Sequence, residues 1–123
     1  MPAPLKDNRL VDMHPIVVKF RRTDLQRVRA AAAHADEIVT LWIRETILLR
    51  LSRVKANLPV SRLSYEPLLG RDEPISIRFR PLQWRRIEAA ARREKTESLR
   101  ETSTWIRAVV LARTKEVLRA EAS

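Results

Sequence analysis

The sequence predicts a mostly helical protein with a small two-stranded antiparallel β-ribbon, built from two strand-helix-helix units in tandem. Three observations predict this fold. A motif occurs twice along the chain, each copy opens with alternating apolar and polar residues, and each continues with helical periodicity. One strand and two short helices cannot bury their own apolar faces, so we expect the two copies to form an intramolecular pseudo-dimer (βαα-βαα).

The repeat consists of two blocks that occur in the same order in both copies. Residues 15–32 match residues 74–91 without a gap at an offset of 59, and residues 40–44 match residues 103–107 at an offset of 63. The second copy therefore carries four extra residues between its blocks. From these matches we predict a flexible N-terminal arm (1–14), a first repeat (15–57), a linker (58–73), a second repeat (74–119) and a tail (120–123), with both repeats in one compact domain.

Each copy is expected to begin with a half-buried strand, because its apolar residues alternate with a period of two. The residues predicted to face inward are Ile16, Val18, Phe20, Ile75, Ile77 and Phe79, and those predicted to face outward are Val17, Lys19, Arg21, Ser76, Arg78 and Arg80. A helix follows each strand. We expect Asp24 to cap the first of these helices and Pro81 to occupy the first turn of its counterpart.

The second helix of each copy is predicted to start at Thr40 and at Ser103, whose hydroxyls suit an N-cap. An apolar stripe that contains a tryptophan follows each hydroxyl. We predict that Trp42, Trp84 and Trp105 belong to the core, because they share the helical periodicity of neighbouring isoleucines. The alternative is an aromatic platform on which nucleic-acid bases stack.

The charge is strongly positive and follows the repeat. The formal net charge is +10, from 20 Arg and 5 Lys against 15 acidic residues. The two repeats carry +5 (15–57) and +6 (74–123, tail included), whereas the linker carries −1 and the arm is neutral. Solvated helix surfaces account for the charged content but not for the excess. A polyanion is therefore the expected class of partner.

Composition argues against several other functions. The absence of cysteine excludes disulfides and thiolate zinc sites, and a single glycine, Gly70, leaves no Gly-rich phosphate loop. His14 and His34 lack companion ligands, and no base accompanies Thr40 or Ser103 as a nucleophile, so we expect no metal, no cofactor and no enzyme activity. No apolar run could span a bilayer and no signal peptide is evident, so we expect a cytoplasmic protein without a membrane partner.

At this point the residues resemble a known family. The strand-helix-helix order, the alternating basic strand and the Thr/Ser-x-Trp-Ile-Arg start of the second helix resemble the ribbon-helix-helix DNA-binding proteins, over residues 15–56 and 74–119. Most members carry one copy and dimerise. This chain looks like a tandem single-chain form, similar in architecture to TraY-type relaxosome accessory proteins of conjugative plasmids. Neither copy has the glycine that often lies between the two helices in the family. The resemblance implies a bacterial or archaeal protein associated with the nucleoid or a plasmid.

The resemblance implies how duplex DNA is bound. The ribbon would enter the major groove, which is wide enough to admit it. The residues implied to contact bases are Val17, Lys19, Arg21, Ser76, Arg78 and Arg80, and those implied to hold phosphates at the second-helix N-termini are Thr40, Leu41, Trp42, Ser103, Thr104 and Trp105. Their chemistry suits these roles, since Arg and Lys bridge guanine acceptors and Val contacts the thymine methyl. The alternative is that the basic strand residues simply face solvent. For Arg44 and Arg107 the alternatives are a phosphate contact and an ion pair with a helix acid.

We therefore expect a sequence-specific double-stranded DNA-binding protein that acts as a transcriptional regulator, most simply a repressor. One alternative is an accessory protein at a transfer origin, with a relaxase or another DNA-processing protein as partner. Less favoured alternatives are an antitoxin and a non-specific architectural or RNA-binding protein. Side-by-side self-association on DNA is also expected of this family. The repeat aligns Val17 with Ser76 and Lys19 with Arg78, which predicts an asymmetric or imperfectly palindromic site.

Overall fold

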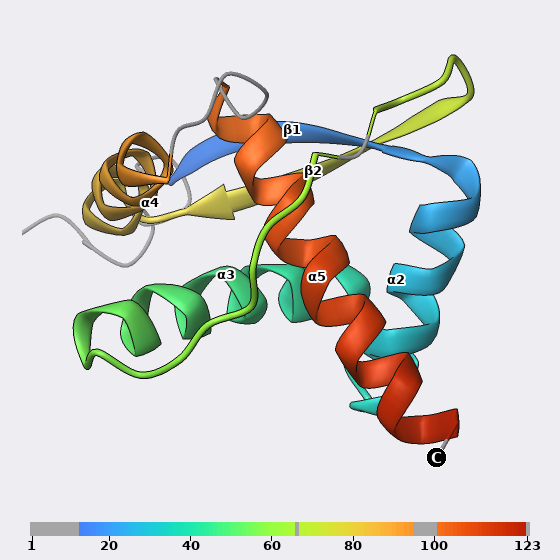
Figure 1. Cartoon of the computed structure of the whole chain (residues 1–123). Helices are drawn as coiled ribbons and strands as arrows, with labels where there is room; N and C mark the ends of the chain where they lie inside the picture. Colours follow the sequence, from blue (N-terminus) through green and yellow to red (C-terminus); the bar gives the residue numbers. More distant parts are fainter. Residues whose placement is uncertain (1–12, 66, 95–100, 123) are drawn as a thin grey trace, which may run out of the picture.

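The computed structural model describes residues 13–65, 67–94 and 101–122. In chain order these residues form β1 (His14–Arg21), α2 (Arg22–His34), α3 (Val39–Lys55), β2 (Asp72–Phe79), α4 (Pro81–Arg93) and α5 (Thr102–Ala122). The described part is therefore mostly helical with a two-stranded antiparallel sheet, as predicted. Figure 1 shows α3 below the ribbon, α5 crossing in front of the ribbon and running down from it, and α2 and α4 near the two ends of the ribbon. Most of the predicted arm (1–12), most of the loop predicted before α5 (97–100) and the last tail residue lie outside the described residues.

The two strands pair along their full length. Val17 lies opposite Ser76 at the centre of the ribbon, and Arg21 lies opposite Asp72 at one end. Val17 and Ser76 are also the residues that the 59-residue offset aligns. Both strands start earlier than predicted, β1 within the arm at His14 and β2 within the linker at Asp72. Hydrogen-bond pairing with the other strand extends each strand beyond its predicted start. This pairing joins residues far apart in the sequence, so the local alternation does not predict it.

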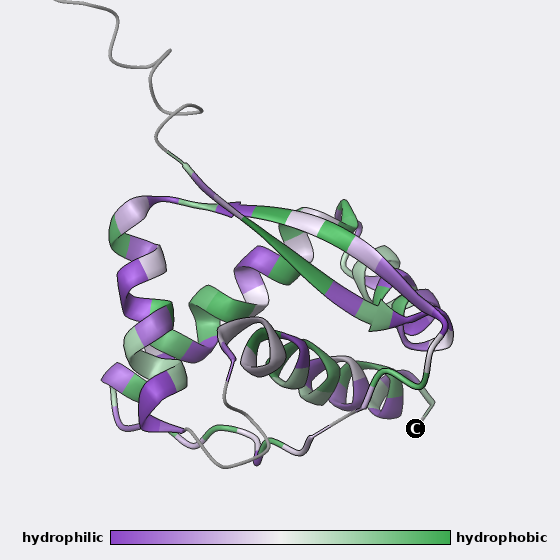
Figure 2. Cartoon of the chain, turned by 90° about the horizontal axis from the view of Figure 1, so that it is seen from above, coloured by the Kyte–Doolittle hydropathy of each residue, from purple (hydrophilic) through white to green (hydrophobic). Residues whose placement is uncertain are grey.

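The core lies beneath the ribbon. The inward strand residues are buried or half-buried, as predicted, and Figure 2 shows hydrophobic and hydrophilic residues alternating along the strands. The largest fully buried side chains are Trp105, Phe20, Phe79, Leu25, Ile43, Ile47, Ile77, Ile87, Ile106, Val18, Val28 and Val110. Burial of each such aliphatic or aromatic side chain contributes about 1.5–3 kcal/mol. Since these residues come from every strand and helix, neither half of the chain holds a complete core.

The second helix of each half packs on the strand of the other half. α3 packs against β2, α5 packs against β1, and the two helices contact each other. The prediction that the tryptophans are core residues is confirmed for Trp42 and Trp105, which are 6% and 0% exposed. Trp84 is half-buried and stacks on His14, with 4.3 Å between the ring centroids.

The predicted helix caps were wrong at three of four positions. α3 begins at Val39 and α5 at Thr102, so Thr40 and Ser103 are the second residues of their helices rather than N-caps. Asp24 lies in the first turn of α2, where it accepts a hydrogen bond from Nε of Arg21 at 3.1 Å. The fourth prediction is confirmed, because α4 begins at Pro81.

At the start of α2 a backbone group from elsewhere in the chain supplies the hydrogen bond, which no local pattern predicts. The chain passes from β1 directly into α2, and the N–H of Arg22 donates to the carbonyl of Arg71 in the linker at 3.1 Å. No side-chain cap is then needed at that end. In α3 the residue before the helix is Ile38, which makes no side-chain cap hydrogen bond.

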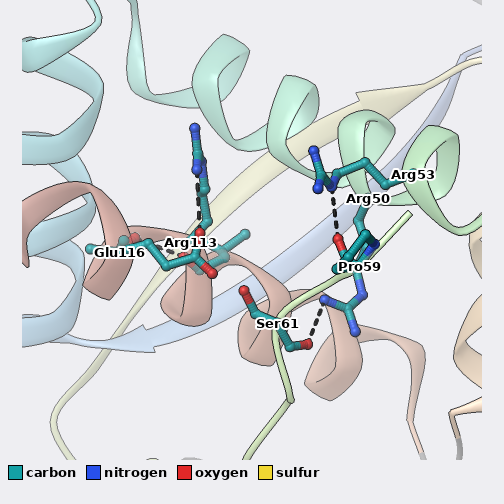
Figure 3. Close-up of polar contacts among 8 residues, drawn as sticks. Arg50, Arg53, Pro59, Ser61, Arg113 and Glu116 are labelled. Carbon is teal, nitrogen blue, oxygen red and sulfur yellow. Dashed lines mark hydrogen bonds and ion pairs between the residues drawn. The ribbon is translucent and has the colours of Figure 1, made fainter. Parts of the chain in front are cut away.

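The linker runs along α3 and is held there by arginines (Figure 3). Nη1 of Arg50 donates to the carbonyl of Ser61 at 3.0 Å, and Nε of Arg53 donates to the carbonyl of Pro59 at 2.9 Å. Just before β2 the chain turns at Gly70, whose φ of 98° is a left-handed value that favours glycine. At the other end of the chain, α5 runs through most of the predicted tail to Ala122.

Candidate nucleic-acid interface

The outer face of the ribbon presents most of the residues predicted to contact bases. Five of the six are exposed, namely Val17, Lys19, Ser76, Arg78 and Arg80. Val17 is 54% exposed although it is aliphatic. Arg21 differs, because its half-buried side chain donates to Asp24 in the first turn of α2. The period-two pattern therefore located the outer face but did not reveal this local partner of Arg21.

The N-termini of α3 and α5 carry backbone N–H groups that donate no hydrogen bond to a described residue. The first three N–H groups of a helix have no carbonyl one turn earlier to bind. These belong to residues 39–41 in α3 and 102–104 in α5. The N–H of Trp42 instead donates to the carbonyl of Ile38 at 2.9 Å, and that of Trp105 donates to Glu101 at 3.0 Å.

Both tryptophans are thus poorly suited to hold a phosphate. Their N–H groups are engaged within the helix, and their side chains are buried. The first residues of the two helices are Val39 and Thr102, one position before the predicted starts. Their backbone N–H groups therefore belong to the first turns in place of those of the tryptophans, and the sequence pattern did not identify them. Identifying these two residues from the sequence would have required the exact first residue of each helix, and tertiary contacts decide that position.

A hollow of about 510 Å³ lies between the N-terminus of α3 and β2. Its lining brings Thr40 and Leu41 beside Ser76 and Arg78, so that residues predicted to contact phosphates and bases meet in one place. Arg44 also lines the hollow and is half-buried. Its Nε is buried and has no hydrogen-bond partner among the described residues.

The equivalent arginine of α5 is held differently. Arg107 is 7% exposed, and its Nη1 donates to the carbonyl of Lys19 in β1 at 3.2 Å. Burial lowers the pKa of Arg107 from its ordinary value. Within the described residues, Arg107 thus binds a backbone carbonyl of the ribbon and not a helix acid.

Two acidic residues lie at one end of the ribbon. Nζ of Lys19 lies 3.8 Å from a carboxylate oxygen of Asp72, and Nε of Arg22 lies 3.4 Å from one of Glu73. By contrast, Arg78 and Arg80 form no ion pair with the described residues. The sequence analysis placed these acids in the linker. If Val17 is paired with Ser76 in an antiparallel ribbon, Asp72 and Glu73 fall opposite Arg21 and Phe20, so this register would have placed both acids in the ribbon.

A second pocket, of about 480 Å³, lies between α3, the linker and α5. Its three arginines already have partners. Arg50 binds both carboxylate oxygens of Glu94, at 3.1 and 2.8 Å, in addition to the linker. Arg113 pairs with Glu116 at 3.3 Å, and Arg53 binds the linker (Figure 3). These contacts explain how the linker is held and do not indicate a ligand.

The described residues contain no group of three or more histidine, cysteine or acidic side chains placed to bind a metal ion. Among the same residues, no helix has both the length and the apolar character that crossing a membrane requires. Comparisons with protein-family models, curated proteins and solved structures find no match for this chain.

Proposed function

We propose that this chain is a sequence-specific double-stranded DNA-binding protein of the ribbon-helix-helix type, which inserts its β-ribbon into the major groove and acts as a transcriptional repressor. The observation that carries the proposal is the exposed outer face of an antiparallel ribbon with Lys19, Arg78 and Arg80 upon it. A two-stranded ribbon fits the major groove, which is about 12 Å wide. The net charge of +10 adds the sequence-independent attraction to phosphates.

The fold proposed with this function is a tandem of two strand-helix-helix units that form a pseudo-dimer. Three observations support it: the element order, the ribbon register and the crossed packing of α3 on β2 and α5 on β1. A pseudo-two-fold axis would then pass through the pair formed by Val17 and Ser76. One chain would supply both halves of a unit that single-copy proteins build as a dimer.

In this proposal, the ribbon reads the sequence and the helix N-termini set its position. The exposed strand residues reach base edges, where Arg78 suits guanine and Val17 suits a thymine methyl. The free N–H groups at 39–41 and 102–104 bind phosphates on either side of the ribbon, with help from the positive ends of the helix dipoles.

The direct test replaces Arg78 with alanine. A duplex selected by the wild-type protein from a random pool, and a random duplex, are titrated with both proteins and followed by fluorescence anisotropy. We expect Arg78→Ala to weaken binding to the selected duplex by about 1–3 kcal/mol, and binding to the random duplex far less. Arg113→Ala removes the same charge away from the ribbon and serves as the control. Equal losses on both duplexes would refute readout by the ribbon.

A further inference from the structure

We infer that the two ends of the ribbon bind DNA unequally, because Asp72 and Glu73 weaken the contact at one end. The inference rests on the proposed function and adds to it the form of the DNA site. One end, here called the open end, comprises Arg78, Arg80 and the hollow beside Arg44. The other, here called the paired end, comprises Lys19 and Arg22 with the two acids that bind them.

The acids have no counterparts in the first half of the chain. The 59-residue offset aligns Asp72 with Met13 and Glu73 with His14. Asp72 lies two residues before Pro74 and four before Ser76 along β2, so it belongs to the outward set of positions. Within the described ribbon, therefore, only one end carries a carboxylate at an outward position.

Asp72 acts on the DNA contact in two ways. It neutralises a cation, so Lys19 must leave Asp72 before it can bind a base or a phosphate. It also places a negative charge close to the phosphates, and that repulsion is weakly screened at a desolvated interface. Arg78, at the position aligned with Lys19, forms no such pair with the described residues.

The helices that flank the ribbon differ in the same sense. At the open end Arg44 lines a hollow together with Thr40 and Arg78. At the paired end Arg107 is buried and binds the carbonyl of Lys19. The open end therefore has an arginine placed to meet a phosphate, whereas the paired end uses its arginine to support the ribbon.

Together these differences predict an asymmetric DNA site. The half of the site that faces Arg78 and Arg80 supplies most of the sequence preference, with guanines opposite the arginines. In the half of the DNA site that faces Lys19, changes of base pair weaken binding much less. The acids at the paired end thus determine specificity by making one half-site weaker, rather than by adding a contact.

The test compares half-sites with the full-length chain. A duplex is selected from a random pool, and each half is scrambled in turn. We expect scrambling one half to weaken binding at least about tenfold more than scrambling the other. Arg78→Ala should abolish the larger of the two losses of affinity that scrambling causes, and Lys19→Ala should abolish the smaller. These results would assign each half of the DNA site to one end of the ribbon.

The acids are tested by the double variant Asp72→Asn/Glu73→Gln, with Glu116→Gln/Glu121→Gln as a control of equal charge change on exposed residues of α5. We expect the first variant to bind the selected duplex several-fold more tightly and to narrow the difference between half-sites. The control should leave that difference unchanged. Thermal unfolding of each variant checks that the fold persists.

The outcomes separate this inference from the proposed function. Wild-type protein that binds selected and random duplexes equally would overturn both. Specific binding with equal penalties for the two halves would overturn the inference and leave the function standing. The inference also fails if the double variant at the ribbon and the double variant on α5 change the half-site difference alike.

Discussion

α3 and α5 begin with matching sequence but use equivalent arginines differently. Arg44 and Arg107 follow the same Trp-Ile pair, yet Arg44 lines an open hollow and Arg107 is buried against β1. The 63-residue offset also aligns Arg50 with Arg113. Arg50 is 8% exposed and bound to Glu94 and the linker, whereas Arg113 is exposed and bound to Glu116.

The comparison shows how matching stretches of sequence have different surroundings in two parts of one chain. The linker lies beside α3, so that Arg50 and Arg53 gain backbone acceptors that α5 does not receive from it. Arginines at aligned positions can therefore be buried and bound to distant partners in one half and be half-buried or exposed in the other.

The largest difference is expected for the stability of variants at Arg50 and Arg113. Arg50→Ala removes the guanidinium that donates to the carboxylate of Glu94 and to the carbonyl of Ser61. We expect a loss of about 2–3 kcal/mol in the free energy of unfolding, measured by urea denaturation. Arg113→Ala removes an exposed pair and should change it by less than about 1 kcal/mol. Similar losses for the two variants would contradict the asymmetry.

A smaller difference is expected in DNA binding between variants at Arg44 and Arg107. Arg44→Ala should weaken binding to selected and random duplexes alike and reduce the slope of log affinity against log salt by about one. Arg107→Met keeps the buried volume and should leave that slope unchanged, because the guanidinium binds Lys19 rather than solvent. Salt titrations of both variants provide the measurement. If Arg107→Met also lowered the slope, the assignment of Arg107 to the ribbon would be wrong.

The smallest effect is expected in the pH dependence of stability and comes from Glu37, which lies before α3. A side-chain hydrogen bond with Glu45, followed by desolvation, raises the pKa of Glu37 from 4.5. A carboxyl group with a raised pKa in the folded state adds stability at low pH, and this is lost as the pH rises from 4.5 through the folded value. α5 has Ala108 at the position aligned with Glu45, so it lacks this pair.

Glu37→Gln tests that effect, because an amide cannot ionise. We expect the variant to be more stable than the wild type near neutral pH and the two to converge below the ordinary pKa of the carboxyl. Urea denaturation across this pH range measures the difference. Glu116→Gln, which lies on α5, is the control. A constant difference at every pH would show that ionisation of Glu37 is not its cause.

Much of the candidate site was predictable because it depends on short-range patterns. Alternation with a period of two placed Val17, Lys19, Ser76 and Arg78 on an exposed face, and it holds wherever one face of a strand is buried. The period-two pattern does not reveal the partner of Arg21, although it lies only three residues away, and it does not give the start of α3. Both features depend on which groups form hydrogen bonds with a side chain or a helix end, and an alternation of apolar and polar residues does not contain that information.

The sequence by itself determined the two strands, the four helices of the described residues and the alternation that separates core from surface, because these arise from contacts between residues close along the chain. Only the tertiary structure decided which arginines are buried, since their partners are distant: Arg50 meets Glu94 across 44 residues, and Arg107 meets Lys19 across 88. It also decided that Asp72 lies beside Lys19, because strand register brings together charges that the linear sequence separates.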